Sequence, residues 1–387
     1  MKRVLLRGPV LTQSGYGVHS RQVARWLLSK DNIDLTIQAL PWGITPWLLN
    51  PDEELTGRIM SCCRQPSNNY DATFQIQLPN EWDPSLGRYN VGITAAVETD
   101  RCNPNWIQSC QAMDSIIVPS THAKQSLTHY PTDKPLNIDV IGESFPDSIL
   151  EYDKNCIDLG DIETDFNLLV FGQLTGNNSE NDRKNLLHTI RTLCEAFASS
   201  PDVGVFLKTN SGKSTKIDKF ITRTTLTNVL TQVRKGPYPR FYFLHGSFDD
   251  REIASLYRHP KVTALVSLTR GEGFGLPILE AAASDLPVIA TDWSGYLDFM
   301  NLGKFIKVNR DIKEIHPSRV DSNIFMKDAR WAFPDEQDFK EKVLKFYKKN
   351  EKPRAWAQEL GETIREQYSF QSIASMYDLK FGKILEG

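Results

Sequence analysis

The sequence lacks the features of a membrane-spanning or disulfide-stabilised chain. No apolar run in its 387 residues approaches the roughly 18 residues that a transmembrane helix needs. The 6 cysteines include the adjacent Cys62 and Cys63, but they form neither a CxxC pair nor a Cys/His metal spacing. The start, MKRVLLRGPV, is too short in its apolar part for a signal peptide and predicts a buried first strand. We therefore expect reduced thiols and a cytoplasmic protein, and peripheral membrane contact is not excluded.

Strong charge of either sign is also missing. The net charge of -3 gives no overall attraction to nucleic acid, although it does not exclude a local basic groove. Neither a repeat of fixed period nor a low-complexity segment is present. A composition of 40% hydrophobic and 24% charged residues excludes a disordered chain and is typical of an ordinary globular protein.

What the sequence does contain is an alternation of short apolar runs with helical patterns, which is typical of the α/β class. A first series starts with RVLLRG and the helical stretch GVHSRQVARWLLSK, and ends near NIDVIGES. A second series begins at FNLLVFGQL, after the polar, acidic stretch EYDKNCIDLGDIETD. The chain length also predicts two domains, at roughly 100–200 residues per domain. We expect two doubly wound halves joined by a linker near residue 151.

Ligands of open parallel sheets bind outside the carboxyl ends of the strands, and three loops at such ends are chemically unusual. The first is GPVLTQSGYGVHSR, in which Gly15 and Gly17 stand at the start of a predicted helix. Glycine permits close backbone approach, and a helix N-terminus attracts anions. The next strand, IDLTIQAL, does not end in the Asp or Glu that holds a ribose, which argues against an NAD dehydrogenase. A plain glycine-rich turn is the alternative.

The second loop, FGQLTGNNSENDRKNLL, places Arg183 and Lys184 at the start of a predicted helix. Cations are unfavourable there because the helix macrodipole is positive at its N-terminus. The pair therefore indicates an anion between the two side chains, such as a diphosphate. A solvated loop with two ordinary surface cations is the alternative.

The third loop lies in SLTRGEGFGLPILEAAASDLP, where Glu272 follows a strand and Glu280 falls about one turn into a helix that Pro277 suits. Gly273 and Gly275 leave backbone amides available for a ligand. A carboxylate can accept two hydrogen bonds from a vicinal diol such as a ribose. The pattern predicts a clamp for a nucleotide sugar. A tight turn followed by a helix-stabilising glutamate is the alternative.

The same stretch carries a family resemblance, because EGFGLPILE resembles the E-x7-E motif of retaining GT-B glycosyltransferases of the family-four group. FLHGSFDDREIASLYRH, DLPVIATDWSGYLDFM, VETDRCNPNWIQSCQAMDSIIVPSTHAKQSL and EQYSFQSIASMYD are similar to further segments of that family, so the likeness covers nearly the whole chain. It implies a GT-B fold, with two Rossmann-like domains facing a central cleft. The expected parts are an acceptor-binding domain at 1–150, a nucleotide-sugar-binding domain at 151–365 and a helix crossing back at 366–387.

The resemblance also implies residue roles. Glu280 would bind the donor ribose, Glu272 would lie beside the donor sugar hydroxyls, and Lys184 would neutralise the leaving diphosphate. Further donor contacts are expected from the amides of Gly273, Phe274, Gly275 and Leu276, from Gly15 and Gly17 of the first domain, and from Gln173, His245 and Gly246.

The chain departs from the family pattern at two places. Gln173 follows Gly172 where the family usually has a phosphate-binding arginine, and Arg183 is our candidate for its replacement. The stretch AAVETDR has no histidine where many members carry one near the reacting sugar, so Glu98 is our candidate there, with a buried structural carboxylate as the alternative. Acceptor contacts are expected from Trp42 and Trp47 of LPWGITPWLL and from Thr99, Asp100 and Arg101.

Together these features predict transfer of a hexose or pentose from a nucleoside diphosphate sugar to an acceptor hydroxyl, with retention. We expect a glycan or a small molecule as the acceptor, with a hydroxymethylated base in DNA as the second candidate, and the base and sugar of the donor are not readable. The sequence has no Asp-x-Asp pair, so we expect catalysis by Glu272, Lys184, Arg183 and Glu98 with no metal and no cofactor beyond the donor. The alternatives are an epimerase or hydrolase of the same fold and a non-catalytic nucleotide-sugar-binding protein.

Overall fold

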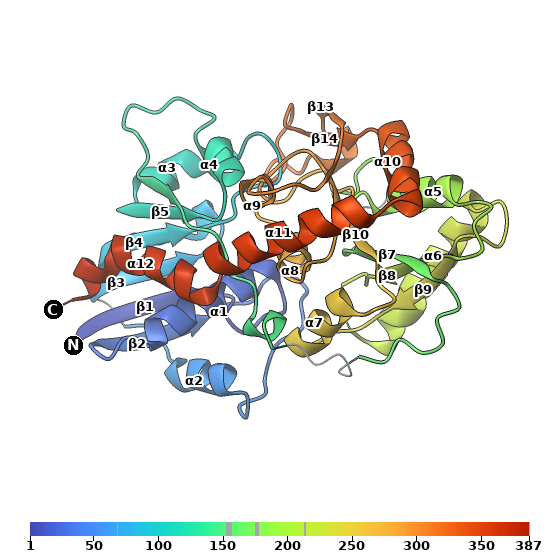
Figure 1. Cartoon of the computed structure of the whole chain (residues 1–387). Coiled ribbons are helices and arrows are strands. Elements are labelled where there is room, and N and C mark those ends of the chain that lie inside the picture. Colours follow the sequence, from blue (N-terminus) through green and yellow to red (C-terminus); the bar gives the residue numbers. More distant parts are fainter. Residues whose placement is uncertain (68, 152–156, 175–177, 213, 387) are drawn as a thin grey trace. The chain divides into compact units, whose positions relative to one another are not determined.

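The computed structural model describes residues 1–67, 69–151, 157–174, 178–212 and 214–386 (Figure 1). Part of the expected linker, residues 152–156, lies outside this description. The contacts divide the chain into two compact units. Unit 1 contains Met1–Ser144, Asp321–Met326 and Phe370–Gly387, and unit 2 contains Phe145–Val320 and Lys327–Ser369.

Unit 1 is built on a parallel sheet with the strand order β2-β1-β3-β4-β5-β6. Val4, Leu5 and Leu6 are consecutive and fully buried, as expected for a strand that helices cover on both faces. The strands are β1 (Lys2–Gly8), β2 (Ile33–Ala39), β3 (Tyr70–Ile76), β4 (Gly87–Ile93), β5 (Ser115–Val118) and β6 (Ile138–Val140). The helices are α1 (Gly15–Leu28), α2 (Glu54–Cys62), α3 (Trp106–Gln111), α4 (Thr121–Leu127) and α12 (Phe370–Leu385).

Unit 2 has a second parallel sheet, with the order β12-β11-β10-β7-β8-β9. Successive residues of β7 belong to different hydrophobic clusters, with Leu169 in one and Leu168 and Val170 in the other, so the sheet is buried on both faces. The strands are β7 (Phe166–Phe171), β8 (Val203–Lys208), β9 (Arg240–Leu244), β10 (Ala264–Ser267), β11 (Val288–Thr291) and β12 (Ile306–Val308), and β13 (Arg310–Glu314) pairs antiparallel with β14 (Arg330–Pro334). The helices are α5 (Leu186–Ala196), α6 (Lys216–Val233), α7 (Asp250–Arg258), α8 (Leu276–Ala283), α9 (Leu297–Met300), α10 (Glu336–Lys348) and α11 (Glu351–Gln367).

The expected α/β class with two doubly wound sheets is confirmed, and the last helix belongs to unit 1. On α12, Tyr377 lies 3.2 Å from His19 Nε2, and Asp378 accepts a hydrogen bond from Trp26 Nε1 at 2.8 Å. The segment Asp321–Met326 differs from the expected continuous range 151–365, because it packs in unit 1, where Asn103 Nδ2 donates to the Asn323 carbonyl.

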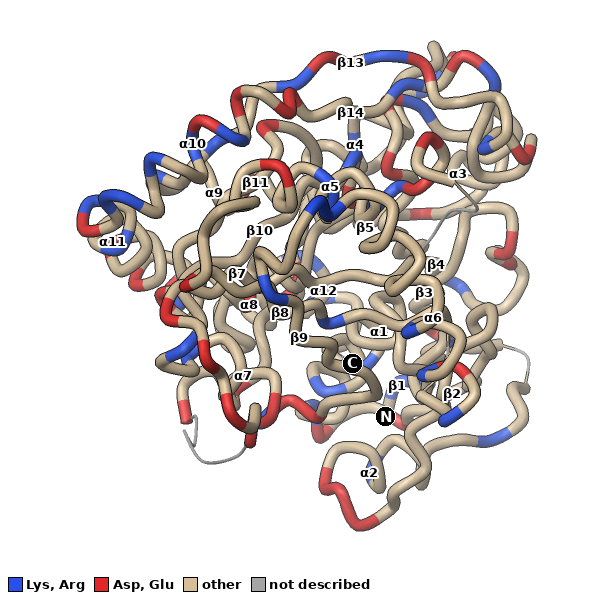
Figure 2. The backbone as a smooth tube through the Cα atoms, turned by 90° about the vertical axis from the view of Figure 1, so that its right-hand side faces the viewer, with Lys and Arg blue, Asp and Glu red and all other residues tan. Residues whose placement is uncertain are grey.

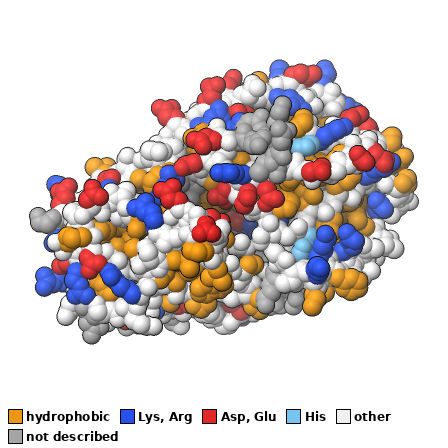
Figure 3. Space-filling view, turned by 90° about the horizontal axis from the view of Figure 1, so that it is seen from below, with side chains coloured by type: hydrophobic (Ala, Val, Ile, Leu, Met, Phe, Trp, Pro, Cys, Tyr) orange, Lys and Arg blue, Asp and Glu red, His pale blue; other side chains and the backbone are white. Residues whose placement is uncertain are grey.

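Charged and hydrophobic side chains are mixed on the surface. Figure 2 shows Lys and Arg interspersed with Asp and Glu along the chain. Figure 3 shows exposed hydrophobic side chains among charged ones on one face, which is common in folded proteins. Among the helices that the structure describes, none has the length and apolar character needed to cross a membrane.

Candidate active site

Glu272 lies in the loop between β10 and α8 and forms ion pairs with two cations. Its carboxylate lies 2.6 Å from Lys184 Nζ through Oε1 and 3.1 Å from Arg183 Nη1 through Oε2. Thr269 Oγ1 donates a further hydrogen bond to Oε1 at 3.0 Å. The glutamate is only 9% exposed, so the charges interact through a medium less polar than bulk water. Two cations around one carboxylate leave this cluster with a net charge of +1.

The environment of Glu272 keeps it ionised. Burial alone would raise the pKa of its carboxyl group, but the charges of Lys184 and Arg183 and the hydrogen bonds from Lys184 and Thr269 outweigh burial and lower the pKa to about 2. A carboxylate with this pKa accepts hydrogen bonds and does not donate them at neutral pH. It therefore suits sugar hydroxyl donors better than a role as a general acid.

The backbone on both sides of Glu272 is held by the loop after β11. The Glu272 N–H donates to Ser294 Oγ at 3.0 Å, and the Glu272 carbonyl accepts from Gly295 N–H at 3.0 Å. Ser294 has a φ of +88°, an uncommon conformation for a residue with a side chain. Ser294 was not among the site residues predicted from the sequence, although the stretch DWSG at a strand end contained the signal.

Gly275 and Phe274 shape the turn into α8. Gly275 caps the helix with a φ of +104°, and a Cβ atom there would lie 3.1 Å from Tyr296 Cβ, so glycine is required on both counts. Phe274 is buried, and its ring packs 5.2 Å from that of Phe299, centroid to centroid. The Phe274 side chain therefore anchors the loop in the core. The expected ligand contacts of the amides of Gly273, Phe274, Gly275 and Leu276 stay predictions.

Arg183 and Lys184 precede α5, which begins at Leu186 after the left-handed Asn185, with a φ of +54°. The sequence indicated an anion between these two side chains, such as a diphosphate. In the structure the Glu272 carboxylate is an anion between the two cations, and the expected diphosphate stays a prediction.

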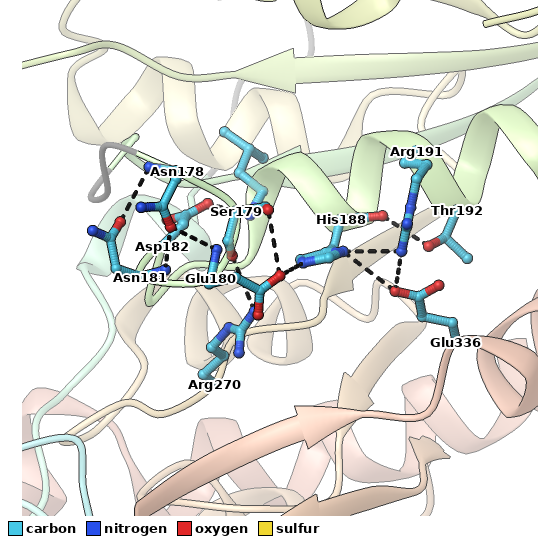
Figure 4. A network of polar contacts seen from close by, with 11 residues as sticks. Asn178, Ser179, Glu180, Asn181, Asp182, His188, Arg191, Thr192, Arg270 and Glu336 are labelled. Carbon is cyan, nitrogen blue, oxygen red and sulfur yellow. Dashed lines mark hydrogen bonds and ion pairs between the residues drawn. The ribbon is translucent and has the colours of Figure 1, made fainter. Parts of the chain in front are cut away.

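The loop that carries the two cations is fixed by a polar network (Figure 4). His188 on α5 lies 3.3 Å from Glu180 and 3.3 Å from Glu336, and Arg191 also pairs with Glu336. The buried Arg270 donates from Nη2 to the Ser179 carbonyl at 3.0 Å. Since these contacts hold the loop at several points, they restrict the positions that Arg183 and Lys184 can take.

Glu280 lies on α8 in a different environment from Glu272. Tyr257 Oη donates to Glu280 Oε2 at 3.1 Å. Burial, followed by the negative charge of Asp250, raises the pKa of Glu280 to about 8, against a smaller lowering effect of the Tyr257 hydrogen bond. At neutral pH this carboxyl group is mainly protonated, so it can both donate and accept a hydrogen bond. The two glutamates of the motif therefore differ in charge.

A small hollow in unit 2 adjoins the Glu272 cluster. It lies at the carboxyl ends of β7 and β10 and beside the start of α8, which is where ligands of such sheets bind. Its lining residues are Phe171, Lys184, Leu265, Ser267, Glu272, Gly275, Pro277 and Ile278. The structure thus brings Lys184, Glu272 and Gly275 together around one space.

A second polar cluster lies at the ends of β8 and β9. Lys208 is buried, donates from Nζ to the Gly246 carbonyl and lies 4.4 Å from the ring centroid of Phe248. Burial lowers the pKa of Lys208 to about 8, against a smaller raising effect of Glu252. The expected donor residue His245 lies 3.4 Å from Asp218. Sequence reasoning missed Lys208, although a lysine that ends the apolar run VGVFLK at a strand's carboxyl end is a usable signal.

Gln173, which stands where the family has arginine, is exposed just beyond β7. The nitrogen of its amide lies 3.8 Å from the position that a Cβ atom on Gly212 would take, in the loop after β8. Gln173 therefore extends toward the end of β8.

In unit 1 the loop after β2 packs beside the start of α1. Trp47 forms an antiparallel bridge with Thr12, and the ring of Trp42 stacks on Tyr16 with centroids 3.9 Å apart. A Cβ atom on Gly15 would meet nothing within 4 Å, whereas one on Gly17 would lie 2.1 Å from the Thr12 carbonyl oxygen. The Gly17 N–H also donates to the helix cap Ser14, so packing and capping explain this glycine without a ligand.

The expected acceptor residues after β4 are partly engaged within their own loop. Thr99 is buried and donates to the Arg101 carbonyl at 3.0 Å, and Asp100 pairs with Arg101 through two contacts of 3.2 and 3.1 Å. Glu98 is partly buried, and its charge acts on the hydroxyl of Tyr16. Glu98 thus stays a candidate, and Thr99 has a structural explanation.

No metal site is evident among the described residues, in which no group of three or more His, Cys, Asp and Glu side chains is arranged to hold an ion.

Comparison with known proteins bears on the second half of the chain. Residues 239–317, from the start of β9 through the Glu272 loop and α8, match the family model of glycosyl transferases group 1. No curated protein matches the chain by sequence.

Solved structures match over the full length. Sucrose-phosphate synthase from Thermosynechococcus elongatus shares 15% identity, with 99% of both chains covered and a TM-score of 0.60. HepE from Anabaena, solved with UDP and glucose, shares 13% identity, with 99% of this chain and 100% of that chain covered and a TM-score of 0.62. A glycosyltransferase from Rickettsia africae shares 13% identity, with 100% and 99% covered and a TM-score of 0.65.

At these identities the structural likeness shows the fold, which is the expected GT-B arrangement of two Rossmann-like domains with C-terminal helices. Together with the matched family segment, it confirms the expected enzyme class, a glycosyltransferase.

Proposed function

We propose that the protein transfers a sugar from a nucleoside diphosphate sugar to an acceptor hydroxyl with retention of anomeric configuration, and that it needs no metal. The arrangement that carries the proposal is Glu272 between Lys184 and Arg183, beside the hollow at the ends of β7 and β10. Sugar hydroxyls would donate to the ionised Glu272. The phosphates would take up the excess positive charge of the cluster.

Breakage of the bond between the anomeric carbon and the diphosphate leaves negative charge on the leaving group. Lys184 and Arg183 stabilise this negative charge, and the backbone amides at the start of α8 stabilise it further. Because Lys184 already lines the hollow and Arg183 is held by the same Glu272 carboxylate, little reorganisation accompanies the step. We therefore assign to the two cations the part that a divalent metal plays in other transferases.

Retention requires the acceptor oxygen to approach the face of the sugar that the diphosphate leaves. We propose that a departing phosphate oxygen takes the acceptor proton while the new bond to the anomeric carbon forms. Glu272 is ionised at neutral pH and has no proton to donate, so it cannot serve as the general acid. Its carboxylate oxygens accept hydrogen bonds from the sugar hydroxyls instead. Glu98 is the candidate carboxylate of unit 1 at the acceptor.

Glu280 would hold the donor ribose. A protonated carboxyl group that donates one hydrogen bond and accepts another matches a vicinal diol, and the Tyr257 hydroxyl orients it. HepE from Anabaena was solved with UDP and glucose, which makes a uridine diphosphate sugar the first donor to test.

The test uses the full chain with a uridine diphosphate sugar and a panel of acceptors in the presence of EDTA, and the anomeric proton of the product is followed by NMR. We expect a product with the donor's configuration and a rate that EDTA does not change. Loss of turnover in EDTA with recovery in Mg²⁺ contradicts the metal-independent step, and an inverted product contradicts retention. Release of free sugar with every acceptor favours a hydrolase.

A further inference from the structure

Helix α6 (Lys216–Val233) exposes apolar residues in its first half and buries polar ones. Ile217, Phe220 and Ile221 are 73%, 71% and 51% exposed. On the inward-facing side, Asp218 and Thr222 are buried and contact the loop after β8, where Asp218 accepts from Ser211 N–H at 3.0 Å. An ordinary surface helix has the reverse orientation.

In the second half of α6 the apolar residues face the core, as is usual. This packing fixes the rotation of the whole helix about its axis. Leu226 is buried, and Val229 and Leu230 pack against the same hydrophobic cluster of unit 2. The three apolar residues are therefore exposed because of the way α6 packs, with the Asp218 side chain buried and hydrogen-bonded to the loop after β8. Single exposed apolar residues are common, but three on one face, at positions i, i+3 and i+4, form a patch.

Cations line one side of this patch. Lys216, Lys219 and Arg223 are exposed and recur at i, i+3 and i+7, so they form a row next to the apolar residues. The only acidic residue of the helix is Asp218, which is buried, so α6 presents positive charge alone in a chain whose net charge is -3.

From this arrangement we propose that the first half of α6 is a docking surface for an anionic lipid bilayer. Ile217, Phe220 and Ile221 enter the boundary between headgroups and acyl chains, while Lys216, Lys219 and Arg223 contact acidic headgroups. An exposed apolar strip beside a row of cations is the pattern of helices that lie in a membrane interface. Nucleic acid would pair with the cations but would leave two isoleucines in water, so lipid fits the surface better.

The experiment is co-sedimentation of the full chain with vesicles of phosphatidylcholine alone and of phosphatidylcholine with about a third phosphatidylglycerol. We expect binding to the anionic vesicles only, weakened by salt. The triple variant Ile217→Ser, Phe220→Ser, Ile221→Ser should lower the partition coefficient more than about tenfold. The variant Lys216→Gln, Lys219→Gln, Arg223→Gln should lower it about fivefold for each cation removed.

Two matched controls locate the surface. Leu379→Ser removes an apolar side chain that is 92% exposed on α12, and Lys345→Gln, Lys348→Gln, Lys349→Gln removes three exposed cations from the end of α10. Both should leave vesicle binding within about twofold of wild type. Circular dichroism melting of each variant verifies folding.

Three outcomes would overturn the proposal. The first is equal binding to both kinds of vesicle, or none to either. The second is an equal loss of binding in the α10 control. The third is duplex DNA binding that depends on the α6 cations but not on Phe220, with no vesicle binding.

Discussion

Lys184 Nζ lies 2.6 Å from Glu272 Oε1, and this contact joins the loop before α5 to the loop before α8. Both loops follow strands of one parallel sheet, β7 and β10, which pair directly. The contact therefore places a cation and a carboxylate at the carboxyl edge of the sheet, far apart in sequence. It relates the two halves of the proposed chemistry, in which Glu272 would meet the sugar and Lys184 would meet the diphosphate.

Replacement of Lys184 by Met should impair donor binding and turnover together. We expect kcat/KM to fall about 100-fold, because a charge stabiliser of the leaving group is lost. Stability should fall by about 1–3 kcal/mol, since the buried Glu272 keeps Arg183 as its remaining cation. Steady-state kinetics and chemical denaturation measure the two effects.

Lys340→Met is the matched control for this variant. Lys340 pairs with Glu195 at 3.1 Å, with the two side chains 27% and 43% exposed. Such surface pairs contribute little, so its stability should stay within about 0.5 kcal/mol of wild type and its kinetics should not change. Equal kinetic losses in both variants would remove the role of Lys184.

Glu272 should contribute stability that depends on acid pH. Its pKa is lowered from 4.5 to about 2 in the folded protein, so the contribution is fully present above pH 4.5 and is lost as pH falls through about 2. The shift corresponds to roughly 3 kcal/mol. We expect the stability difference between wild type and Glu272→Gln to shrink by an amount of this order between pH 5 and pH 2, as followed by urea denaturation. A difference that is constant over this range would show that the ion pairs do not form.

Glu280 should behave in the opposite way. Its pKa is raised from 4.5 to about 8, so its stability contribution is fully present below pH 4.5 and is lost as pH rises through about 8. Glu280→Gln imitates the protonated carboxyl group. This variant should therefore bind donor within a few-fold of wild type at pH 7, whereas Glu280→Ala should bind at least about tenfold more weakly, in line with lost hydrogen bonds to a ribose.

Titration calorimetry at pH 7 and pH 9 measures the donor affinities of the wild type and of the two Glu280 variants. Wild-type donor affinity should change between the two values, because Glu280 loses its proton, and the affinity of Glu280→Gln should not. The ribose assignment fails if Glu280→Ala retains wild-type affinity.

The glycines at the start of α1 should respond differently to alanine. Gly17→Ala brings a Cβ atom to 2.1 Å from the Thr12 carbonyl oxygen, so the backbone must shift, and we expect a loss of about 2–4 kcal/mol. Gly15→Ala meets nothing within 4 Å and should be neutral or slightly stabilising. Thermal denaturation compares the two variants, and a Gly17→Ala protein as stable as wild type would contradict this packing.

Much of the fold was predictable from the sequence because its strands are short apolar runs, such as RVLLRG, that are buried on both faces. Helix α6 was not predicted, since its first half exposes Ile217 and Phe220 and buries Asp218, which destroys the expected helical pattern. A parallel connection from β8 to β9 nevertheless requires a crossover of this length. The rule that parallel neighbouring strands need a long crossover connection was therefore more informative here than the hydrophobic periodicity of the sequence.

The Glu272 cluster consists of residues that the sequence had named as candidates, but their pairing was not predictable. The unfavourable position of Arg183 and Lys184 indicated an anion, and nothing local identified Glu272, 88 residues after Lys184, as that anion. The different charge states of Glu272 and Glu280 were also unreadable, because they depend on burial, on Lys184 and Arg183 at Glu272, and on Asp250 at Glu280. Both properties arise only when distant segments meet at the sheet edge.

The most direct test of the central claim is a thermal-shift panel of UDP-, GDP-, ADP- and dTDP-sugars with wild type, Lys184→Met and the Lys340→Met control. We predict that one nucleotide sugar raises the melting temperature of wild type and the control by several degrees, as mass action requires of a specific ligand, and that the shift is largely lost in Lys184→Met. If no nucleotide sugar shifts wild type, or if Lys184→Met shifts as much as the control, the Glu272 cluster is not a donor site.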